Sequence, residues 1–166
     1  MITYLAPNYG YIDHDSHATT KIFLGGSIEM GTAEKWQDAL TEFLSSYEDD
    51  IIVLNPRRSD WDSSWIQDPT PGTQFHEQVT WELDAQEDSD IHVYYFDPNT
   101  KSPVTLMEVA MVGIVSPETT IVCCSPDFYR YGNVKIFCDR HGITIVETYE
   151  EIEEVLAYWL EQIEEE

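Results

Sequence analysis

Short apolar segments alternate with amphipathic stretches along most of the chain. The apolar segments predict five β-strands at residues 21–24, 51–54, 91–96, 119–124 and 143–146. Apolar side chains at helical spacing predict helices over residues 75–88 and 150–164, and further helices that contain Trp36 or begin near Ser102 and Tyr131. Strands that alternate with helices pair in parallel, so we predict a three-layer α/β sandwich with a five-stranded parallel sheet.

The first twenty residues do not follow this pattern. Residues 1–20 are rich in Tyr, Asp, His and Thr without periodicity, which predicts an irregular N-terminal arm before one domain over residues 21–166. His14 and His17 stand beside aspartates, but metal ligands need rigid support, so we interpret this stretch as a flexible polar segment rather than a metal site.

The charge of the chain excludes several classes of partner. There are 8 basic and 32 acidic residues, a net charge of −24 that repels nucleic acid polymers and anionic membrane surfaces. Cys123, Cys124 and Cys138 are odd in number and form no CxxC pair, so we expect reduced core thiols. The chain shows neither a signal-peptide pattern nor an apolar run of about 18 residues. We therefore expect a cytoplasmic protein that does not bind membranes.

One carboxylate stands inside an otherwise uncharged run, at Glu108 within residues 102–113. Ser102 fits the N-cap and Pro103 the first position of a helix, so Glu108 lies about two turns in. A partly apolar environment would raise its pKa and make it a candidate nucleophile or general base. The alternative is a glutamate on the solvent side of an amphipathic helix.

Other candidate site residues follow the ends of predicted strands. Gly25, Gly26 and Ser27 form a loop between the first strand and a helix, where the backbone can approach a ligand or where glycines are needed only for steric reasons. The loop is neither a GxGxxG nor a Walker sequence, which disfavours a dinucleotide or triphosphate. Asn55 and Arg57 follow the second strand, beside the crevice where open α/β sheets bind ligands. Arg57 also fits plain neutralisation of nearby acids.

A long loop and a second glutamate complete the candidates. Trp61 and Trp65 lie in the loop over residues 59–73, and they can stack on a planar ligand or pin the loop to the core. Glu82 shares a helix face with apolar residues. Together these features favour a small enzyme with a pocket over a scaffold, without choosing the substrate.

Five motifs, in order, resemble those of the nucleoside 2-deoxyribosyltransferase-like proteins, over about residues 21–146. They are FLGGSIE (23–29), NPRR (55–58), QVTWE (78–82), SPVTLME (102–108) and YGNV (131–134). The resemblance implies a flavodoxin-like (Rossmann-like) fold and transfer of the 2-deoxyribosyl group between nucleobases by double displacement, as in nucleotide salvage. It implies a small deoxynucleoside and a free nucleobase as substrates, and no metal or organic cofactor.

The resemblance also implies roles for single residues. Glu108 matches the family's nucleophile, and Glu82 matches an acidic residue, usually Asp, that handles protons on the base. Asn133 matches a residue that in relatives enters the neighbouring subunit's site and touches the sugar 5′-hydroxyl. We therefore expect a homo-oligomer with sites shared between subunits.

Departures from the family pattern keep other functions open. Phe23 stands where better-known transferases have a Tyr that orients the nucleophile, and Ser102 where they have an Asp. A Ser there is similar to deoxynucleoside 5′-monophosphate N-hydrolases, in which it helps to hold the phosphate, whereas Glu29 stands where those hydrolases carry an Arg. The alternatives are therefore an N-glycosidase acting on a 2′-deoxynucleoside or its 5′-monophosphate, and a non-catalytic nucleotide-binding module.

Overall fold

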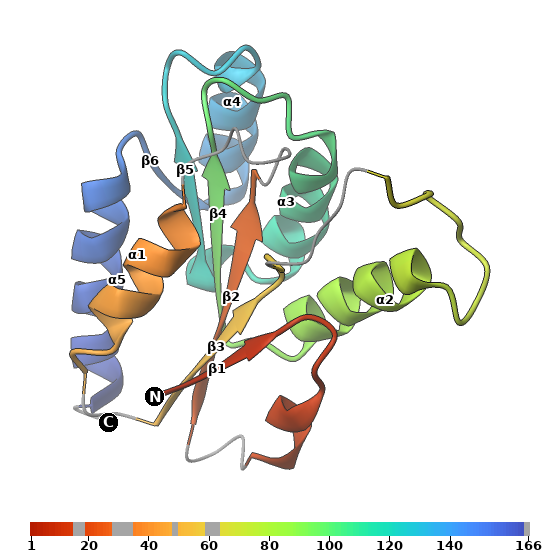
Figure 1. The fold of residues 1–166 in the computed structure, drawn as a ribbon. Helices are drawn as coiled ribbons and strands as arrows, with labels where there is room; N and C mark the ends of the chain where they lie inside the picture. Colours follow the sequence, from red (N-terminus) through yellow and green to blue (C-terminus); the bar gives the residue numbers. More distant parts are fainter. Residues whose placement is uncertain (15–18, 28–34, 48–49, 59–63, 165–166) are drawn as a thin grey trace.

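Six parallel strands form one sheet through the centre of the protein (Figure 1). The structure is a computed structural model that describes residues 1–14, 19–27, 35–47, 50–58 and 64–164. The strands are β1 (Ile2–Leu5), β2 (Thr20–Gly26), β3 (Ile51–Asn55), β4 (Ile91–Phe96), β5 (Thr120–Cys124) and β6 (Thr144–Val146). They lie side by side in the order β1-β3-β2-β4-β5-β6, and every pair is parallel.

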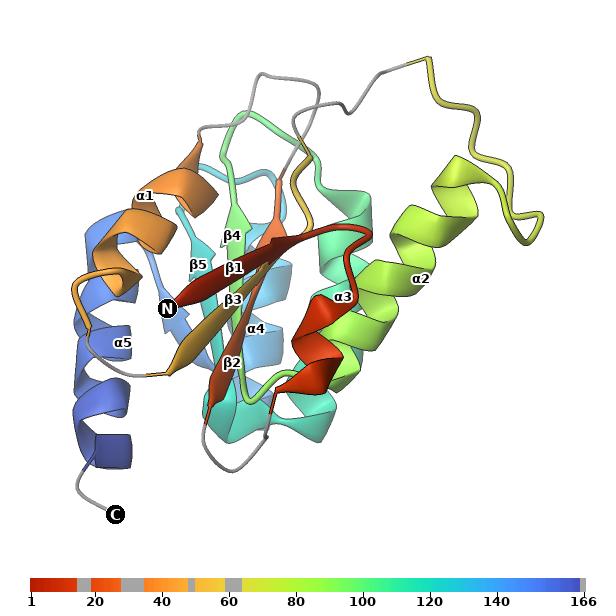
Figure 2. The same ribbon diagram turned by 60° about the horizontal axis from the view of Figure 1, so that its bottom comes forward.

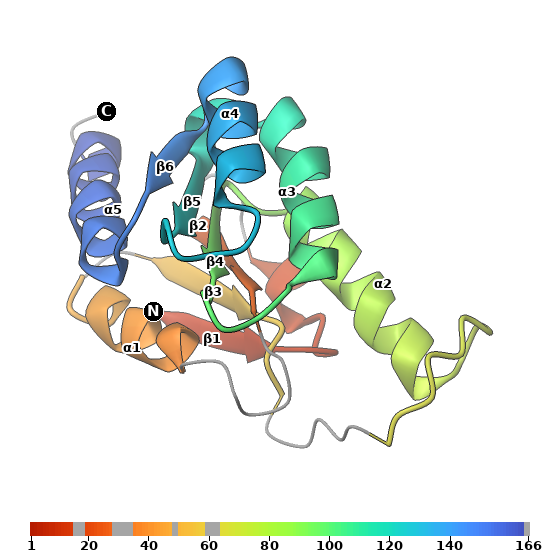
Figure 3. The ribbon, with the colours of Figure 1, turned by 90° about the horizontal axis from the view of Figure 1, so that it is seen from above.

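Helices cover both faces of the sheet, so the predicted three-layer sandwich is confirmed. The helices are α1 (Trp36–Leu44), α2 (Gln74–Glu87), α3 (Pro103–Val115), α4 (Tyr131–His141) and α5 (Tyr149–Glu164), with short 3-10 helices η1 (Gly10–Asp13) and η3 (Pro117–Thr119). Seen along the sheet, α1 and α5 lie on one side and α2, α3 and α4 on the other (Figure 3). Within the described residues, no helix is both long enough and apolar enough to cross a membrane.

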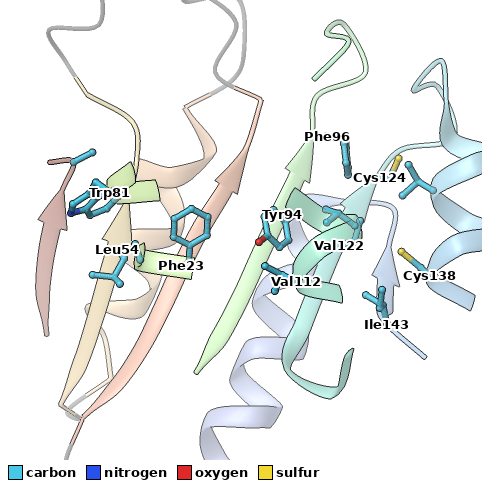
Figure 4. Close-up of a cluster of buried hydrophobic side chains, with 14 of the residues drawn as sticks. Phe23, Leu54, Trp81, Tyr94, Phe96, Val112, Val122, Cys124, Cys138 and Ile143 are labelled. Carbon is cyan, nitrogen blue, oxygen red and sulfur yellow. The ribbon is translucent and has the colours of Figure 1, made fainter. Parts of the chain in front are cut away.

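Alternating side chains of the strands divide the interior into two cores. In β4, Tyr94 and Phe96 face the core under α2, α3 and α4, whereas Val93 and Tyr95 face the core under α1 and α5. Figure 4 shows the first of these clusters. All six residues of β4 are buried, which explains why apolar side chains stand on both faces of this strand rather than at alternate positions. The three cysteines are buried and free, as expected.

The N-terminal segment corrects the sequence analysis. Residues 2–5, predicted to be irregular, form β1 at the edge of the sheet, so the sheet has six strands rather than five. This strand pairs with β3 from Ile2 opposite Ile52 to Leu5 opposite Asn55. It has only four residues, which are exposed or half-buried, so its sequence carries no apolar alternation. Pairing with the edge of β3, rather than a pattern in its own sequence, makes this segment a strand.

The same segment continues onto α2, and Figure 2 shows η1 beside that helix. Tyr11 is buried with its ring edge-on to Trp81, and the Trp81 indole Nε1 donates to the carbonyl oxygen of Asn8 at 2.9 Å. The hydroxyl of Tyr9 donates to Asp84 at 2.7 Å. These contacts hold the outer side of α2, whose other side faces the site described below.

We predict that the end of β2 does not tolerate a side chain at Gly26. This residue has φ +147°, and an added Cβ would collide with the backbone carbonyl of Tyr95. Gly26→Ala should therefore lower the free energy of unfolding by about 2 kcal/mol or more in urea titrations. Gly132→Ala in α4 is the control, because a Cβ there meets nothing within 4 Å. Equal stability of the two variants would contradict the steric argument.

Candidate active site

A cavity of about 350 Å³ opens at the carboxyl ends of β2 and β3. In the sheet, β3 lies on one side of β2 and β4 lies on the other. The strand order therefore reverses at β2, beside this cavity. The end of β2, the first turns of α3 and one side of α2 form most of its wall. The lining residues are Gly25, Gly26, Ser27, Pro56, Gln67, Phe75, Val79, Glu82, Ser102, Pro103, Val104, Thr105 and Glu108.

Glu108 reaches this cavity from the second turn of α3. It is only 7% exposed, so its predicted burial is confirmed and the solvent-side interpretation is wrong. Its Oε1 accepts a hydrogen bond of 3.2 Å from Nε2 of Gln86. Desolvation, with the nearby charge of Glu82, raises the pKa of Glu108 from 4.5 to about 8.

Glu82 faces the same cavity from α2. Its Oε1 accepts a 2.7 Å hydrogen bond from Nε2 of Gln78, four residues earlier on the helix, and the same nitrogen donates to the carbonyl oxygen of Pro56 at 3.0 Å. Burial raises the pKa of Glu82 from 4.5 to about 7, while the hydrogen bond from Gln78 acts in the opposite direction. Gln78 thus holds the Glu82 side chain in place, but its hydrogen bond does not bring the pKa of Glu82 back to the ordinary value.

Two carboxyl groups with raised pKa values therefore share one cavity. Each disfavours ionisation of the other, so they titrate as a pair, and near neutral pH the pair retains a proton. One member can then donate a proton while the other attacks as a carboxylate. This is the division of roles found where two acids act on a glycosidic bond.

Hydroxyl groups gather where α3 begins. The Oγ of Ser27 accepts from the backbone N–H of Asp97 at 2.9 Å and contacts the hydroxyls of Thr100, at 2.8 Å, and Ser102. Ser102 and Pro103 occupy the predicted N-cap and first helical positions. However, Ser102 has φ 45°, and its side chain bonds to this cluster instead of capping the helix.

Several predicted site residues lie outside the cavity wall. Asn55 is buried, and its Oδ1 accepts from the backbone N–H of Arg57 at 2.9 Å, so it shapes the turn after β3. Arg57 extends toward α1, where Nη1 donates to Oε1 of Gln37 at 3.3 Å. The Trp65 ring lies 4.9 Å from the guanidinium carbon of Arg58. Trp61 is outside the described residues.

Asn133 is also outside this wall, on the exposed first turn of α4. In contrast, Gly25, Gly26, Ser27 and Ser102, which the sequence makes candidates for substrate contacts, line the cavity. Close packing alone requires a glycine at position 25, because a Cβ at Gly25 would lie 2.5 Å from the Tyr94 ring. The loop is therefore both tightly packed and open to a ligand.

The sequence analysis did not identify the glutamines that hold the two acids. Gln78 and Gln86 stand four residues before and after Glu82, so all three lie on one side of α2. This spacing is the signal that points to them. Tyr94, which bonds to Gln86, carries no comparable signal because its neighbours Val93 and Tyr95 on the strand are also buried.

The family comparison agrees with this geometry. A family model described as nucleoside 2-deoxyribosyltransferase-like matches residues 19–128, a range that includes β2 and the complete cavity wall. The chain belongs to this family. The resemblance found in the motifs is thereby confirmed, although the YGNV motif with Asn133 lies beyond the matched range. None of the curated proteins compared with the chain matches it.

Membership in this family indicates a nucleoside deoxyribosyltransferase-like enzyme with a related glycosyl-transfer function. In the part of the chain that the structure describes, no group of three or more His, Cys, Asp and Glu side chains is arranged to hold a metal ion.

We predict that removing the charge of Glu108 stabilises the protein at high pH. A carboxyl group whose folded pKa is raised contributes stability below its ordinary pKa of 4.5, and that contribution is lost as pH rises to about 8. Glu108→Gln should therefore gain about 2 to 4 kcal/mol over the wild type at about pH 9, and little at about pH 5. Thermal unfolding followed by circular dichroism measures this difference.

The matched control is Glu118→Gln, an exposed glutamate in η3 just after the same helix. Its unfolding temperature should follow that of the wild type at both pH values. A stability difference for Glu108→Gln that does not change with pH would contradict the raised pKa.

Proposed function

We propose that the protein transfers 2-deoxyribosyl groups between nucleobases by double displacement, with Glu108 as the nucleophile. The observation that carries this proposal is the pair of desolvated acids, Glu108 and Glu82, on the wall of one cavity at the strand-order reversal. The cavity volume suits a small molecule such as a nucleoside, and the net charge of −24 disfavours a polynucleotide.

In the first step, the Glu108 carboxylate attacks C1′ of the deoxynucleoside. The bond from C1′ to the base breaks, its electron pair leaves with the base, and the base takes a proton from Glu82. The transition state carries positive charge on the sugar ring, which an adjacent carboxylate in an apolar wall stabilises strongly. The product is a covalent deoxyribosyl ester of Glu108.

In the second step, a nitrogen of the incoming base attacks C1′, and the ester bond breaks to restore the Glu108 carboxylate. Glu82 takes the proton that the incoming base loses. Two inversions at C1′ give net retention. Gly25, Gly26 and Ser27 form the wall nearest the carboxyl end of β2, where we assign contacts to the sugar and base. Such base exchange serves nucleotide salvage, and the buried free thiols support a cytoplasmic setting.

A second candidate function is hydrolysis of the same glycosidic bond, on a nucleoside or its 5′-monophosphate. The hydroxyl cluster of Ser27, Thr100 and Ser102 favours it, because hydroxyl donors where a helix begins suit a phosphate group. In this reaction water replaces the incoming base in the second step. A third candidate, a non-catalytic nucleotide-binding module, uses the same cavity without turnover.

We predict base exchange when the protein is incubated with 2′-deoxyinosine and free adenine. Chromatography should show 2′-deoxyadenosine, formed fastest between about pH 7 and 8, where the pair holds one proton. The reacting form has Glu108 ionised and Glu82 protonated, and it is the less populated of the two singly protonated forms because Glu108 has the higher pKa. Glu108→Ala should lower the rate by about a thousandfold or more, since the covalent route is lost. Glu118→Ala is the control for an exposed glutamate.

The other outcomes separate the candidate functions. Hypoxanthine without a new nucleoside would identify a hydrolase, and a panel of 5′-monophosphates would then test the role of the hydroxyl cluster. Binding without turnover across purine and pyrimidine nucleosides and their monophosphates would identify the binding module and contradict an enzyme.

We also propose a homo-oligomer in which a second copy covers the outward face of α3. This helix is apolar on its outer side as well as toward the core: Met107 is 63% exposed, Ile114 57% and Val115 79%. A helix that is apolar all round is normally buried on both sides. Glu108 is the helix's one charged residue and points inward, so the outward face of α3 adds no charge of its own to a contact between two copies of this acidic chain.

We predict that Met107→Glu combined with Ile114→Glu produces monomers. Two buried carboxylates in an apolar interface would be repulsive and desolvated. Light scattering coupled to size exclusion should show an oligomer for the wild type and a monomer for the variant. Tyr158→Glu, at an exposed position on α5 across the sheet, should leave the oligomer intact. A monomeric wild type would contradict the proposal.

A further inference from the structure

We propose that Gln86 and Tyr94 are positioning residues that together orient the carboxylate of Glu108. They form a hydrogen-bonded chain that runs from β4 through α2 to α3. The catalytic consequence rests on the function proposed above, whereas the positioning itself is a property of the free protein. The two can therefore be tested separately.

Both the nitrogen and the oxygen of the Gln86 side-chain amide are hydrogen-bonded. Gln86 is 2% exposed; its Nε2 donates to Oε1 of Glu108 at 3.2 Å and to the backbone carbonyl of Glu82 at 2.9 Å. Its Oε1 accepts from the Tyr94 hydroxyl at 2.6 Å. A carbonyl oxygen can only accept, so the contact with Glu82 requires the NH2 group on that side. The amide therefore has one orientation, and it presents a donor to Glu108.

The Tyr94 ring is held rigidly at the other end of the chain. It is fully buried in the cluster of Figure 4, where it lies among apolar side chains. Its centroid is 6.2 Å from that of Phe23, and Gly25 packs so closely that an added Cβ would lie 2.5 Å from the ring. Burial, reinforced by the charge of Glu108, raises the pKa of Tyr94 well above 10. Its hydroxyl therefore remains a donor at every working pH.

The backbone of Gln86 is attached to the same strand. Its carbonyl oxygen lies 2.7 Å from Nε2 of His92, which is two residues before Tyr94 on β4. Burial lowers the pKa of His92, so the ring is neutral, and the carbonyl requires the proton on Nε2. Both the backbone and the side chain of Gln86 are thus fixed against the sheet. Glu108 receives its hydrogen bond from a donor that cannot follow the carboxylate if it rotates.

This fixed donor matters because a carboxylate turns easily about its last torsion. The hydrogen bond from Gln86 holds Oε1, and we assign the attack on C1′ to the other oxygen, Oε2. It also favours the ionised form and so opposes part of the desolvation that raises the pKa of Glu108. Phe23, on the neighbouring strand, has no hydroxyl, so it cannot supply this contact. The chain from Tyr94 provides it from β4 instead.

The experiment compares Gln86→Met, Tyr94→Phe and the double variant, with Gln74→Met at an exposed position of α2 as control. In the free protein, carbon-13 NMR of labelled glutamate carboxyls follows the titration of Glu108, whose signal is identified by its loss in Glu108→Gln. We expect Gln86→Met to raise the pKa of Glu108 by about one unit, because the donor is lost. Tyr94→Phe should raise it less, and Gln74→Met should leave it unchanged.

Kinetics of base exchange provide the second measurement. Gln86→Met should lower kcat about 10- to 100-fold with KM nearly unchanged, and Tyr94→Phe should lower it about 3- to 10-fold. Because Tyr94 acts through Gln86, the double variant should be no slower than Gln86→Met alone. A loss of folded enzyme would also lower the apparent kcat at constant KM, so each kcat is referred to the folded fraction measured by circular dichroism. Independent structural effects of the two substitutions would multiply in the double variant.

The outcomes are distinguishable. An unchanged Glu108 titration in Gln86→Met, or multiplied kinetic losses in the double variant, would overturn the positioning chain. If Gln86→Met does not fold, the smaller change in Tyr94→Phe still tests it, and an unchanged Glu108 titration there would overturn it. The two substitutions can shift the Glu108 titration even if the wild type exchanges no base. That result would support the positioning chain while refuting the proposed function.

Discussion

Desolvation of two carboxyl groups in one cavity is the constraint on which the rest of the site depends. An unpaired buried carboxylate costs several kcal/mol, so it persists only when neighbouring groups offset part of that cost. Here glutamines serve that purpose: Gln78 donates to Glu82, and Gln86 donates to Glu108. A neutral donor holds each acid in place while leaving its pKa raised, whereas a lysine or arginine would lower it.

The fold meets this constraint by bringing three segments together on one face of the sheet. α2 carries Glu82 and both glutamines, α3 carries Glu108, and β4 carries the tyrosine that fixes Gln86. Gly25 on β2 leaves the space that the Tyr94 ring fills, so a glycine at the cavity wall also supports the interior behind it. The N-terminal segment holds the far side of α2 through Trp81 and Asp84.

The cavity differs from the rest of this acidic chain because most of its lining residues are uncharged. The chain has 32 acidic residues, and among those that the structure describes, Glu82 and Glu108 are the only ones that line the cavity. A cavity that is neutral or singly charged admits an uncharged nucleoside readily. The uncharged outer face of α3 adjoins it, because Val104 is both exposed and part of the cavity wall. An oligomer formed on this face would therefore border the site.

The local sequence was enough to predict features that depend on the burial of a single segment. The run 91–96 predicted a buried strand, and a single charge in the apolar run 102–113 made Glu108 a candidate buried carboxyl group, because burial selects residue types along each segment. Only the tertiary structure decided that residues 2–5 form a strand and that Asn55 and Arg57 are not among the lining residues of the cavity. It also joined Tyr94, Gln86 and Glu108, since contacts between β4, α2 and α3 leave no periodicity in any one of them.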